Sequence, residues 1–168
     1  MGMTFNIPLI PLRNHVAFPG AVLPLPIGRP KTLSAVEHAQ KLKEPVGLVA
    51  QRSPSVDDPG QDDLYDVGVS AEIIRATERG PQGISLIVRT EKRFRIKAIT
   101  QTTPYLRAEV EEIETVAGDT VKAQALLVNV RENARRLGEI ASRVPEQRTE
   151  WIESVLRLEH PANVADLV

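Results

Sequence analysis

The chain has 168 residues, 42% of them apolar, and its 21 basic and 22 acidic residues give a formal charge of −1. This near-neutrality argues against non-specific binding to DNA or anionic lipid, because both need a clear basic excess. No apolar run reaches the roughly 18 to 20 residues of a membrane span, the first residues do not form a secretory signal, and the absence of cysteine excludes disulfides and cysteine-based zinc sites. We therefore expect a folded, soluble, cytoplasmic protein without a membrane partner.

Composition changes along the chain near residues 117–119. Most prolines and glycines lie before this point, and Gly138 is the one glycine after Thr120. We expect residues 1–118 to form a β-rich subdomain with one helix near residues 31–43. Residues 119–168 are expected to begin an α-helical subdomain, so the predicted fold class is α+β.

The first 50 residues predict two strands and a helix. Residues 7–12 are apolar, but their two prolines cannot donate to a ladder, which predicts an edge or irregular strand. Pro30 is typical of a first helical turn, and a buried strand is expected at residues 46–50. Helical spacing predicts four inward-facing residues in the helix: Leu33, Val36, Ala39 and Leu42.

Alternation of apolar and polar residues predicts further strands. It covers residues 65–73, 84–88, 94–98 and 106–110, and residues 79–83 have the composition of a hairpin loop. Several short antiparallel strands favour a compact barrel or folded sheet, because closure removes exposed edges.

The second half of the sequence predicts helices. Apolar residues recur at helical spacing from Ala123 to Ala141, with Leu137 among those expected to face inward and Asp119 as the expected N-cap. Pro145 ends this helix, an apolar stripe at residues 151–156 predicts a second one, and Pro161 can begin a third. Because about eight residues are too few for a stable free helix, the C-terminus at Val168 is expected to be a cut end.

Two segments resemble known catalytic motifs, but each lacks residues that the motif requires. Residues 28–32 end in the Lys-Thr pair of a phosphate-binding loop but lack its glycine spacing, so a helix start is the expected role. Residues 68–72 lack the last glycine of a nucleophile elbow and lie within an alternating strand. We therefore expect no enzyme activity from this chain.

Metal-ligand spacing is absent as well. The three histidines (His15, His38 and His160) are far apart in sequence, which argues against a zinc or copper site. The densest group of carboxylates, at residues 57–63, does not have the ligand order of a calcium loop, and a solvated acidic loop is expected there. We expect no cofactor.

Two kinds of polymer, nucleic acid and polypeptide, are considered as ligands of this chain. A basic strip could follow one strand (Lys92, Arg93, Arg95 and Lys97), but aromatic residues are only 4% of the chain, which argues against nucleic acid as a partner. Ile74 and Ile87 are out of phase with their strands, so they are either covered by another element or part of an exposed apolar patch that binds extended polypeptide. Leu23 and Leu25 are weaker candidates for the same patch.

A series of short motifs runs in a fixed order along nearly the whole chain: Ile7-Pro8-Leu9-Ile10-Pro11-Leu12-Arg13-Asn14, Phe18-Pro19-Gly20, Pro24, Gly28-Arg29-Pro30-Lys31, Leu48-Val49-Ala50-Gln51, Asp57-Asp58-Pro59, Asp62-Asp63-Leu64-Tyr65-Asp66-Val67-Gly68, Arg93-Phe94-Arg95-Ile96, Pro161 and Ala165-Asp166. In this order the motifs resemble the N-terminal domain of the ATP-dependent protease Lon. The sequence departs from the family at Thr90-Glu91, where relatives often carry a Glu-Gly step, so the bend after the strand at residue 84 is expected to differ.

The resemblance implies a PUA-like β-rich subdomain followed by a helical one that is longer in the family. It also implies that this region captures damaged or unfolded protein substrates and assists assembly of a hexamer of Lon protomers, with the ATPase and peptidase further along a full-length chain. The predicted function is therefore non-catalytic recognition of polypeptides, with contacts at Ile74, Ile87, Leu23 and Leu25. The alternative is a stand-alone adaptor that binds a ligand or RNA.

Overall fold

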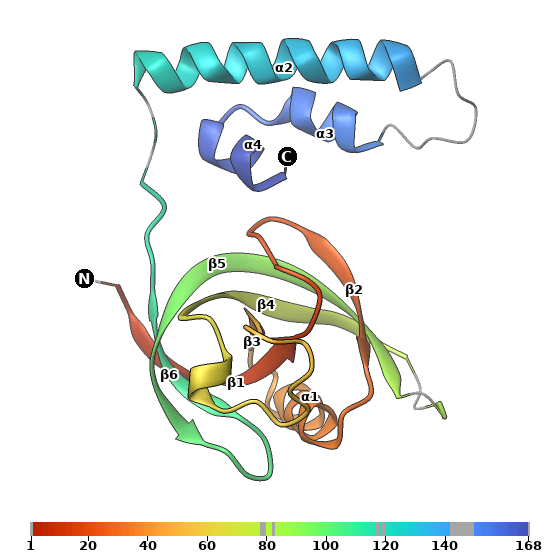
Figure 1. Ribbon diagram of the computed structural model, residues 1–168, viewed down its shortest axis with the longest axis vertical. Helices are drawn as coiled ribbons and strands as arrows, with labels where there is room; N and C mark the ends of the chain where they lie inside the picture. The colour runs from red at the N-terminus through yellow and green to blue at the C-terminus, as the bar shows by residue number, and fades with distance from the viewer. Residues whose placement is uncertain are drawn as a thin grey trace. The chain divides into compact units, whose positions relative to one another are not determined.

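The computed structural model describes residues 2–77, 80–81, 83–116, 118, 120–141 and 150–167 (Figure 1). Its elements are β1 (Thr4–Leu12), β2 (Val22–Ile27), α1 (Pro30–Leu42), β3 (Val46–Ala50), a 3-10 turn (Gln61–Asp63), β4 (Val67–Ala76), β5 (Ile84–Gln101), β6 (Arg107–Glu112), α2 (Val121–Ala141), α3 (Glu150–Arg157) and α4 (Pro161–Leu167). They form two compact units, Met1–Glu114 and Thr115–Val168. The α+β class is confirmed, and the assignment of separate domains with a boundary at residue 118 stays a prediction.

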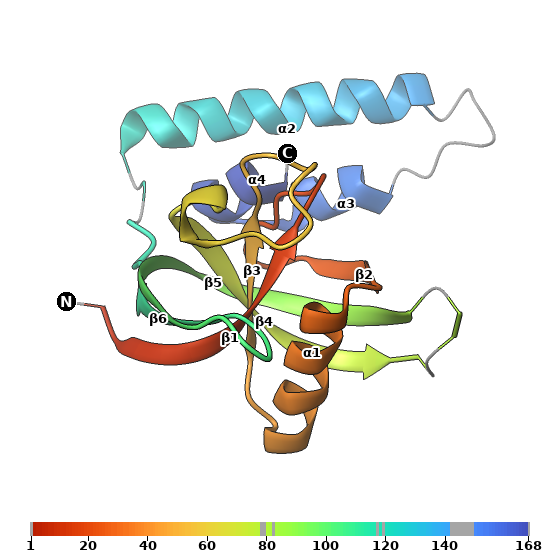
Figure 2. The same cartoon turned by 60° about the horizontal axis from the view of Figure 1, so that its bottom comes forward.

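Six strands of the first unit form one sheet in the order β2-β5-β4-β3-β1-β6, and a further pairing of β5 with β6 closes it. β5 makes this closure possible because it has 18 residues. Its first half pairs with β2 and its second half with β6, while β4 runs beside much of its length. Figures 1 and 2 show β5 as a long, strongly curved strand. The predicted barrel-like closure is therefore present, with β2 outside the closed ring.

The prediction that the first strand lies at an edge is wrong, because β1 lies between β3 and β6. The Leu9 N–H donates to the Leu106 carbonyl oxygen (2.9 Å), and the Leu12 carbonyl oxygen accepts from the Gln51 N–H (2.8 Å). The backbone groups of odd-numbered residues of β1 therefore point toward β6, and those of even-numbered residues point toward β3. Pro8 precedes the residues paired with β3, and Pro11 lies beyond those paired with β6. Each proline therefore occupies a place where no ladder donor is needed.

Two register shifts between β4 and β5 change which of their side chains share a face of the sheet. Val69 pairs with Arg93 while Ala71 pairs with Thr90, so β5 has one extra residue between its two partners. Thr90 and Arg93 consequently share a face of the sheet, although strict alternation would separate them.

The second irregularity is on β4. Ile73 pairs with Val88 and Arg75 pairs with Ile87, which leaves Ile74 as an extra, unpaired residue. This bulge accounts for the two consecutive isoleucines that break the alternation, because a bulged residue leaves the ladder and its side chain is redirected.

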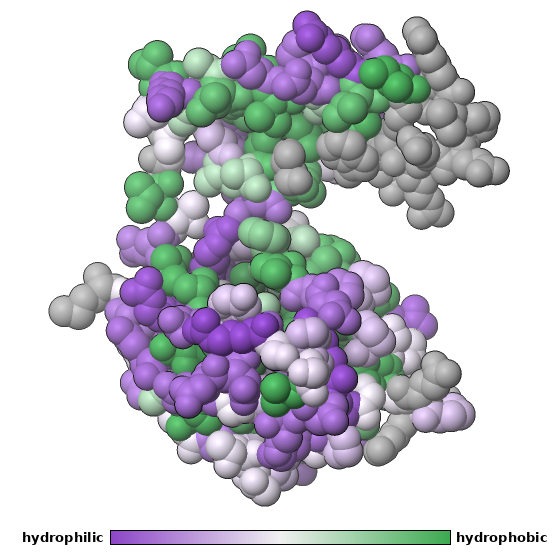
Figure 3. Space-filling view, in the orientation of Figure 1, coloured by the Kyte–Doolittle hydropathy of each residue, from purple (hydrophilic) through white to green (hydrophobic). Residues whose placement is uncertain are grey.

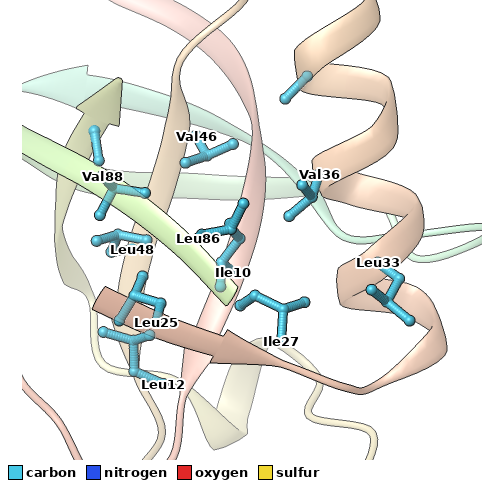
Figure 4. Close-up of a cluster of buried hydrophobic side chains, with 12 residues drawn as sticks. Ile10, Leu12, Leu25, Ile27, Leu33, Val36, Val46, Leu48, Leu86 and Val88 are labelled. Carbon is cyan, nitrogen blue, oxygen red and sulfur yellow. The ribbon is translucent and has the colours of Figure 1, made fainter. Parts of the chain in front are cut away.

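The β unit has two cores. One lies between α1 and the sheet (Figure 4), and Phe94 is the largest side chain of the other. The buried members of the first are Ile10, Leu12, Leu25, Ile27, Leu33, Val36, Ala39, Val46, Leu48, Ala71, Leu86 and Val88. Three of the four inward-facing helix residues are thus confirmed, but Leu42 is 57% exposed because it lies in the last turn, just before the left-handed Lys43.

The second unit consists of α2, α3 and α4 around a small core. The core contains Leu127, Ala134, Ile152, Val155 and Val164. Thr120 caps α2, since its Oγ1 accepts from the Ala123 N–H at 3.1 Å. The cap predicted at Asp119 and the helix end predicted at Pro145 lie outside the described residues. Leu137 was expected to face inward and is instead 51% exposed.

Candidate functional site

Apolar side chains that remain exposed gather around one groove of the β unit. The groove has a volume of about 320 Å³ and is lined by Val16, Ala17, Phe18, Leu48, Ala50, Tyr65, Val67, Gly68, Val69 and Arg93. Four of these residues are large, apolar and far from buried: Val16 is 66% exposed, Phe18 44%, Tyr65 48% and Val67 41%. We call this feature the β groove. Because water contacts so many neighbouring apolar groups here, covering the groove with another apolar group is favourable.

The loop that carries Val16 and Phe18 is held by Thr90. The Thr90 side chain is only 2% exposed, and its hydroxyl lies 2.7 Å from the Phe18 carbonyl oxygen and accepts from the Ala21 N–H at 2.8 Å. Its backbone N–H donates to the Ala21 carbonyl (2.9 Å), and its carbonyl accepts from the Gly20 N–H (3.1 Å). One residue of β5 therefore fixes the wall of the β groove.

The opposite wall is basic. Arg93 lies across from Val69 and Arg95 across from Val67, and directly opposed residues share a face. Arg52 covers the Tyr65 ring, with its guanidinium carbon 4.9 Å from the ring centroid. The Arg52 Nε–H donates to the Leu64 carbonyl oxygen (2.8 Å), and Nη2 lies 3.4 Å from Asp66. Arg93 is therefore the one arginine that lines the groove, while Arg52 and Arg95 lie beside its lining residues Tyr65 and Val67.

The sequence-predicted contacts lie elsewhere in the β unit. Ile74 is 51% exposed on its bulge, beside a polar cavity of about 600 Å³ that residues of α1, β4 and β5 line. Ile87 is half-buried between Pro24 of β2 and Arg75 of β4. The structure does not bring Ile87 or Ile74 to the β groove.

The two leucines of β2 are partly or wholly buried. Leu23 is half-buried and packs against the first core. Leu25 is 4% exposed and lies beside Leu12 and Leu48 (Figure 4). Pro24 and Pro26 take the exposed positions of the strand, so Leu25 stays a predicted contact that is buried in this structure.

Sequence reasoning missed Val16, Phe18, Tyr65 and Val67. Tyr65 and Val67 belong to an alternating run, but β4 begins only at Val67, and its ladder with β3 begins only at Val69. The available signal was the apolar triplet Val16-Ala17-Phe18 directly before the Pro19-Gly20 turn. An apolar triplet in a loop has no strand or helix to bury it.

The basic strip of β5 is largely neutralised by β6. Lys92 Nζ lies 2.5 Å from Glu112, and Lys97 Nζ lies 2.5 Å from Glu111. The hydrogen bond and positive charge of Lys97 hold the pKa of Glu111 below its usual range. This pairing removes much of the excess charge that binding to phosphates would need.

A second ionic cluster surrounds the start of α1, in the segment that lacks the glycine spacing of a phosphate-binding loop. Arg29 donates to Gln51 Oε1 (2.7 Å) and to the Pro11 carbonyl oxygen, and burial lowers its pKa. Lys31 Nζ lies 2.7 Å from both carboxylate oxygens of Asp58, and Arg13 pairs with Asp57. The acidic loop is therefore tied to the barrel by ion pairs. Among the described residues, no group of three His, Cys, Asp or Glu side chains could hold a metal ion.

Helix α2 also has an apolar surface. A groove of about 360 Å³ between α2 and α4 is lined by Ala123, Leu126, Leu127, Val130, Pro161, Val164 and Ala165. Hydrophobic side chains extend along this unit in Figure 3, whereas the visible face of the β unit is largely hydrophilic. Within the described part of the chain, no helix is both long and apolar enough to span a bilayer.

Comparison with known proteins places the chain in a family. Over 163 residues it is 38% identical to a Lon protease of Anaeromyxobacter dehalogenans and, over the same length, 38% identical to Lon protease 2 of Myxococcus xanthus. Both alignments cover 96% of this chain but 19% of the relative, so the chain spans about a fifth of their length.

Two solved structures share the fold. The N-terminal domain of a Mycobacterium avium complex Lon protease matches with a TM-score of 0.71 at 21% identity, over 96% of this chain and 80% of that one. A Lon N-terminal domain protein from Xanthomonas campestris matches with a TM-score of 0.59 at 20% identity, over 96% and 95%. The family model of the substrate-binding domain of the ATP-dependent protease La (Lon) matches residues 6–168. The chain therefore belongs to the Lon substrate-binding domain family.

Proposed function

We propose that this chain captures unfolded or damaged polypeptides in the β groove and presents them to an ATP-driven protease. The observation that carries the proposal is the cluster of four exposed apolar side chains around a single groove (Val16, Phe18, Tyr65 and Val67). Unfolded proteins expose apolar segments that folded proteins bury, so such a groove discriminates by state of folding more than by sequence.

Capture uses side chains and not strand addition. At the edge strand β2, proline has no N–H, so Pro24 and Pro26 offer no donor to an incoming strand. On β4 the bulge at Ile74 interrupts the ladder. An extended peptide therefore gains little from backbone pairing at either place, and its apolar side chains supply the affinity.

The chemistry of degradation belongs to other parts of the protease. Relatives that carry the name Lon protease are about five times as long as the segment that matches this chain. In a ring of protomers, several weak grooves would act on one polypeptide, and their combined avidity would exceed the affinity of each. Weak single contacts also allow release into a translocating pore.

Methyl NMR of the whole 168-residue chain tests the site. Addition of a permanently unfolded protein, such as reduced and carboxymethylated lactalbumin, should shift the methyl signals of Val16 and Val67. Ile74, Ile87 and Leu23 stay predicted as additional contacts, and their methyl signals report on that patch in the same spectra. Shifts confined to α2, α3 and α4 would contradict the proposal.

A matched pair of variants measures the contribution of the groove. The double variant Val16→Thr/Val67→Thr keeps the side-chain shape and should weaken binding of the unfolded protein about fivefold, because two apolar groups are no longer available for burial. Val22→Thr changes a valine of β2 that is 60% exposed and lies outside the groove. It should leave the affinity unchanged, and an equal loss in both variants would refute the choice of site.

A further inference from the structure

The start of α1 lies beside another cavity of the β unit. This cavity has a volume of about 330 Å³ and shares no lining residue with the β groove. Its apolar lining comes mainly from Leu9 and Pro11 of β1, Pro30 of α1 and Leu106 just before β6. Such a surface favours a hydrocarbon group, because water is released from both when they meet. We call this feature the α1 cavity.

Helix α1 brings unbonded backbone donors to this cavity. Pro30 has no N–H, and the Leu33 N–H donates to the Arg29 carbonyl oxygen (2.9 Å). The N–H groups of Lys31 and Thr32, which also line the cavity, are left over, because Arg29 at the N-cap makes no side-chain capping bond and the first turn has no acidic residue. The positive end of the helix dipole adds to the attraction of these donors for an anion.

The Thr32 side chain is a second, independent indication of a ligand. Thr32 is only 6% exposed and lines the cavity, yet within the described part of the chain its hydroxyl has no hydrogen-bond partner. A side-chain atom sealed in the interior without a partner is costly, and among the described residues Arg131 Nε is the only such atom. The Thr32 hydroxyl is therefore not sealed but open to a cavity.

The α1 cavity is where this hydroxyl meets the free N–H groups. Thr32 also borders a neighbouring cavity of about 370 Å³ on the side of His15. Pro30 and Lys31 line the α1 cavity and not that neighbour. Three donors thus converge beside an apolar surface.

The charged residues of the lining are already satisfied and stay at the rim. The side chains of Asp57 and Asp58 are 88% and 64% exposed, so water screens their repulsion of an anion. They pair with Arg13 and Lys31, respectively. The hydrogen bonds of Arg29 go to neutral acceptors, namely Gln51 Oε1 and the carbonyl oxygens of Pro11 and Asp57. An anion held by the helix start needs none of these cations and displaces none of their partners.

We propose that the α1 cavity binds an apolar group that carries a carboxylate. The carboxylate accepts hydrogen bonds from the N–H groups of Lys31 and Thr32 and from the Thr32 hydroxyl, and the hydrocarbon body lies against Leu9, Pro11 and Leu106. An apolar residue at the C-terminus of a polypeptide has this chemistry, and so does a free carboxylic acid. The inference is independent of the β groove.

Amide NMR titrations of the whole chain with N-acetylleucine and N-acetylleucinamide test the inference, because the probes differ only in the carboxylate. At neutral pH, N-acetylleucine should shift the signals of Lys31 and Thr32 and bind at least about tenfold more tightly than the amide. Acetate, which lacks the hydrocarbon body, should also bind at least about tenfold more weakly. Equal affinity of either control probe, absence of binding, or shifts confined to other elements would overturn the proposal.

The source of the carboxylate is decided by the peptide Gly-Gly-Ser-Leu with a free C-terminus, and its amidated form is the control. Tighter binding of the free peptide than of N-acetylleucine would support a polypeptide C-terminus as the ligand. Weaker binding would support a free carboxylic acid. If the amidated peptide bound as tightly as the free one, the carboxylate would have no role and the proposal would fail.

The variant Thr32→Val removes the hydroxyl and keeps the shape of the side chain. It should weaken binding of N-acetylleucine about fivefold, and it should not lower stability in urea, because the hydroxyl has no partner in the described protein. Ser34→Ala is the matched control, since Ser34 is on the same helix and lines neither cavity. Unchanged affinity in Thr32→Val, or an equal loss in both variants, would refute the site.

Discussion

At the scale of single residues, the hydroxyl of Thr90 is buried and has its partners on one loop. It bonds to Phe18 and Ala21, which are 72 and 69 residues away in sequence. A buried donor or acceptor that loses its partner costs more free energy than the net value of the bond, because a group that stays buried cannot bond to water instead. Thr90 therefore holds the loop before β2 against β5.

Thr90→Val should lower the free energy of unfolding by about 1–3 kcal/mol, because the variant has the same shape but leaves the Ala21 N–H without its acceptor. Urea unfolding measures the loss, and amide exchange at Ala21 should accelerate. Thr100→Val is the control on the same strand, since the Thr100 hydroxyl bonds to Asn6 at the surface. The control should stay within about 0.5 kcal/mol of wild type. Equal losses would show that Thr90 has no special role.

At the scale of elements, β2 is an edge strand whose sequence prevents further pairing. Leu23, Leu25 and Ile27 supply the donors toward β5, and the exposed positions between them are prolines. Natural sheets use proline at edges to avoid joining other sheets. Under the proposed function, this protection keeps the edge of the sheet from pairing with the unfolded chains that the domain captures.

Replacing both prolines, in Pro24→Thr/Pro26→Thr, should therefore cause self-association, because the variant restores two outward N–H groups on a strand with good β propensity. Light scattering after gel filtration should show dimers or larger species that increase with concentration. Pro54→Thr alters an exposed proline of the acidic loop and should remain as wild type. A monomeric double variant would show that the prolines are not what protects this edge.

Several elements could be predicted from the sequence because their signals are local. The apolar run of β3, the amphipathic α1 and the placement of Phe94 in the core all follow from periodicity within a few residues. The position of β1 inside the sheet could not be predicted, because it depends on two partners distant in sequence. The β groove was missed for the same reason: Thr90 and β4 bring its walls together from separate parts of the chain.

At the scale of the whole molecule, the two units have cores of unequal size. Within the described residues, the helical unit has five buried apolar members, whereas the two clusters of the β unit have twelve and eight. A smaller core contributes less hydrophobic free energy. Two cores that share no members need not unfold together.

We therefore expect two unfolding transitions in urea, with the helical unit unfolding first. The chain has one tryptophan, Trp151 in α3, and two tyrosines, Tyr65 and Tyr105 in the β unit. Tryptophan fluorescence and fluorine NMR of incorporated fluorotyrosine thus report on different units. Coincident transitions by both probes would contradict independent unfolding and indicate one cooperative structure.

The floor of the β groove is backed by the barrel interior. A Cβ atom added at Gly68 would lie 2.5 Å from Cζ of Phe94, and one at Gly47 on the neighbouring strand would lie 2.9 Å from the same atom. The aromatic ring thus occupies the room that side chains at both glycines would need. A larger side chain at either glycine would clash with the Phe94 ring, so the depth of the groove cannot change without disrupting the core of the barrel. Under the proposed function, we therefore expect differences in peptide preference between related domains to arise from residues at the rim of the groove, such as those of the Val16–Phe18 loop.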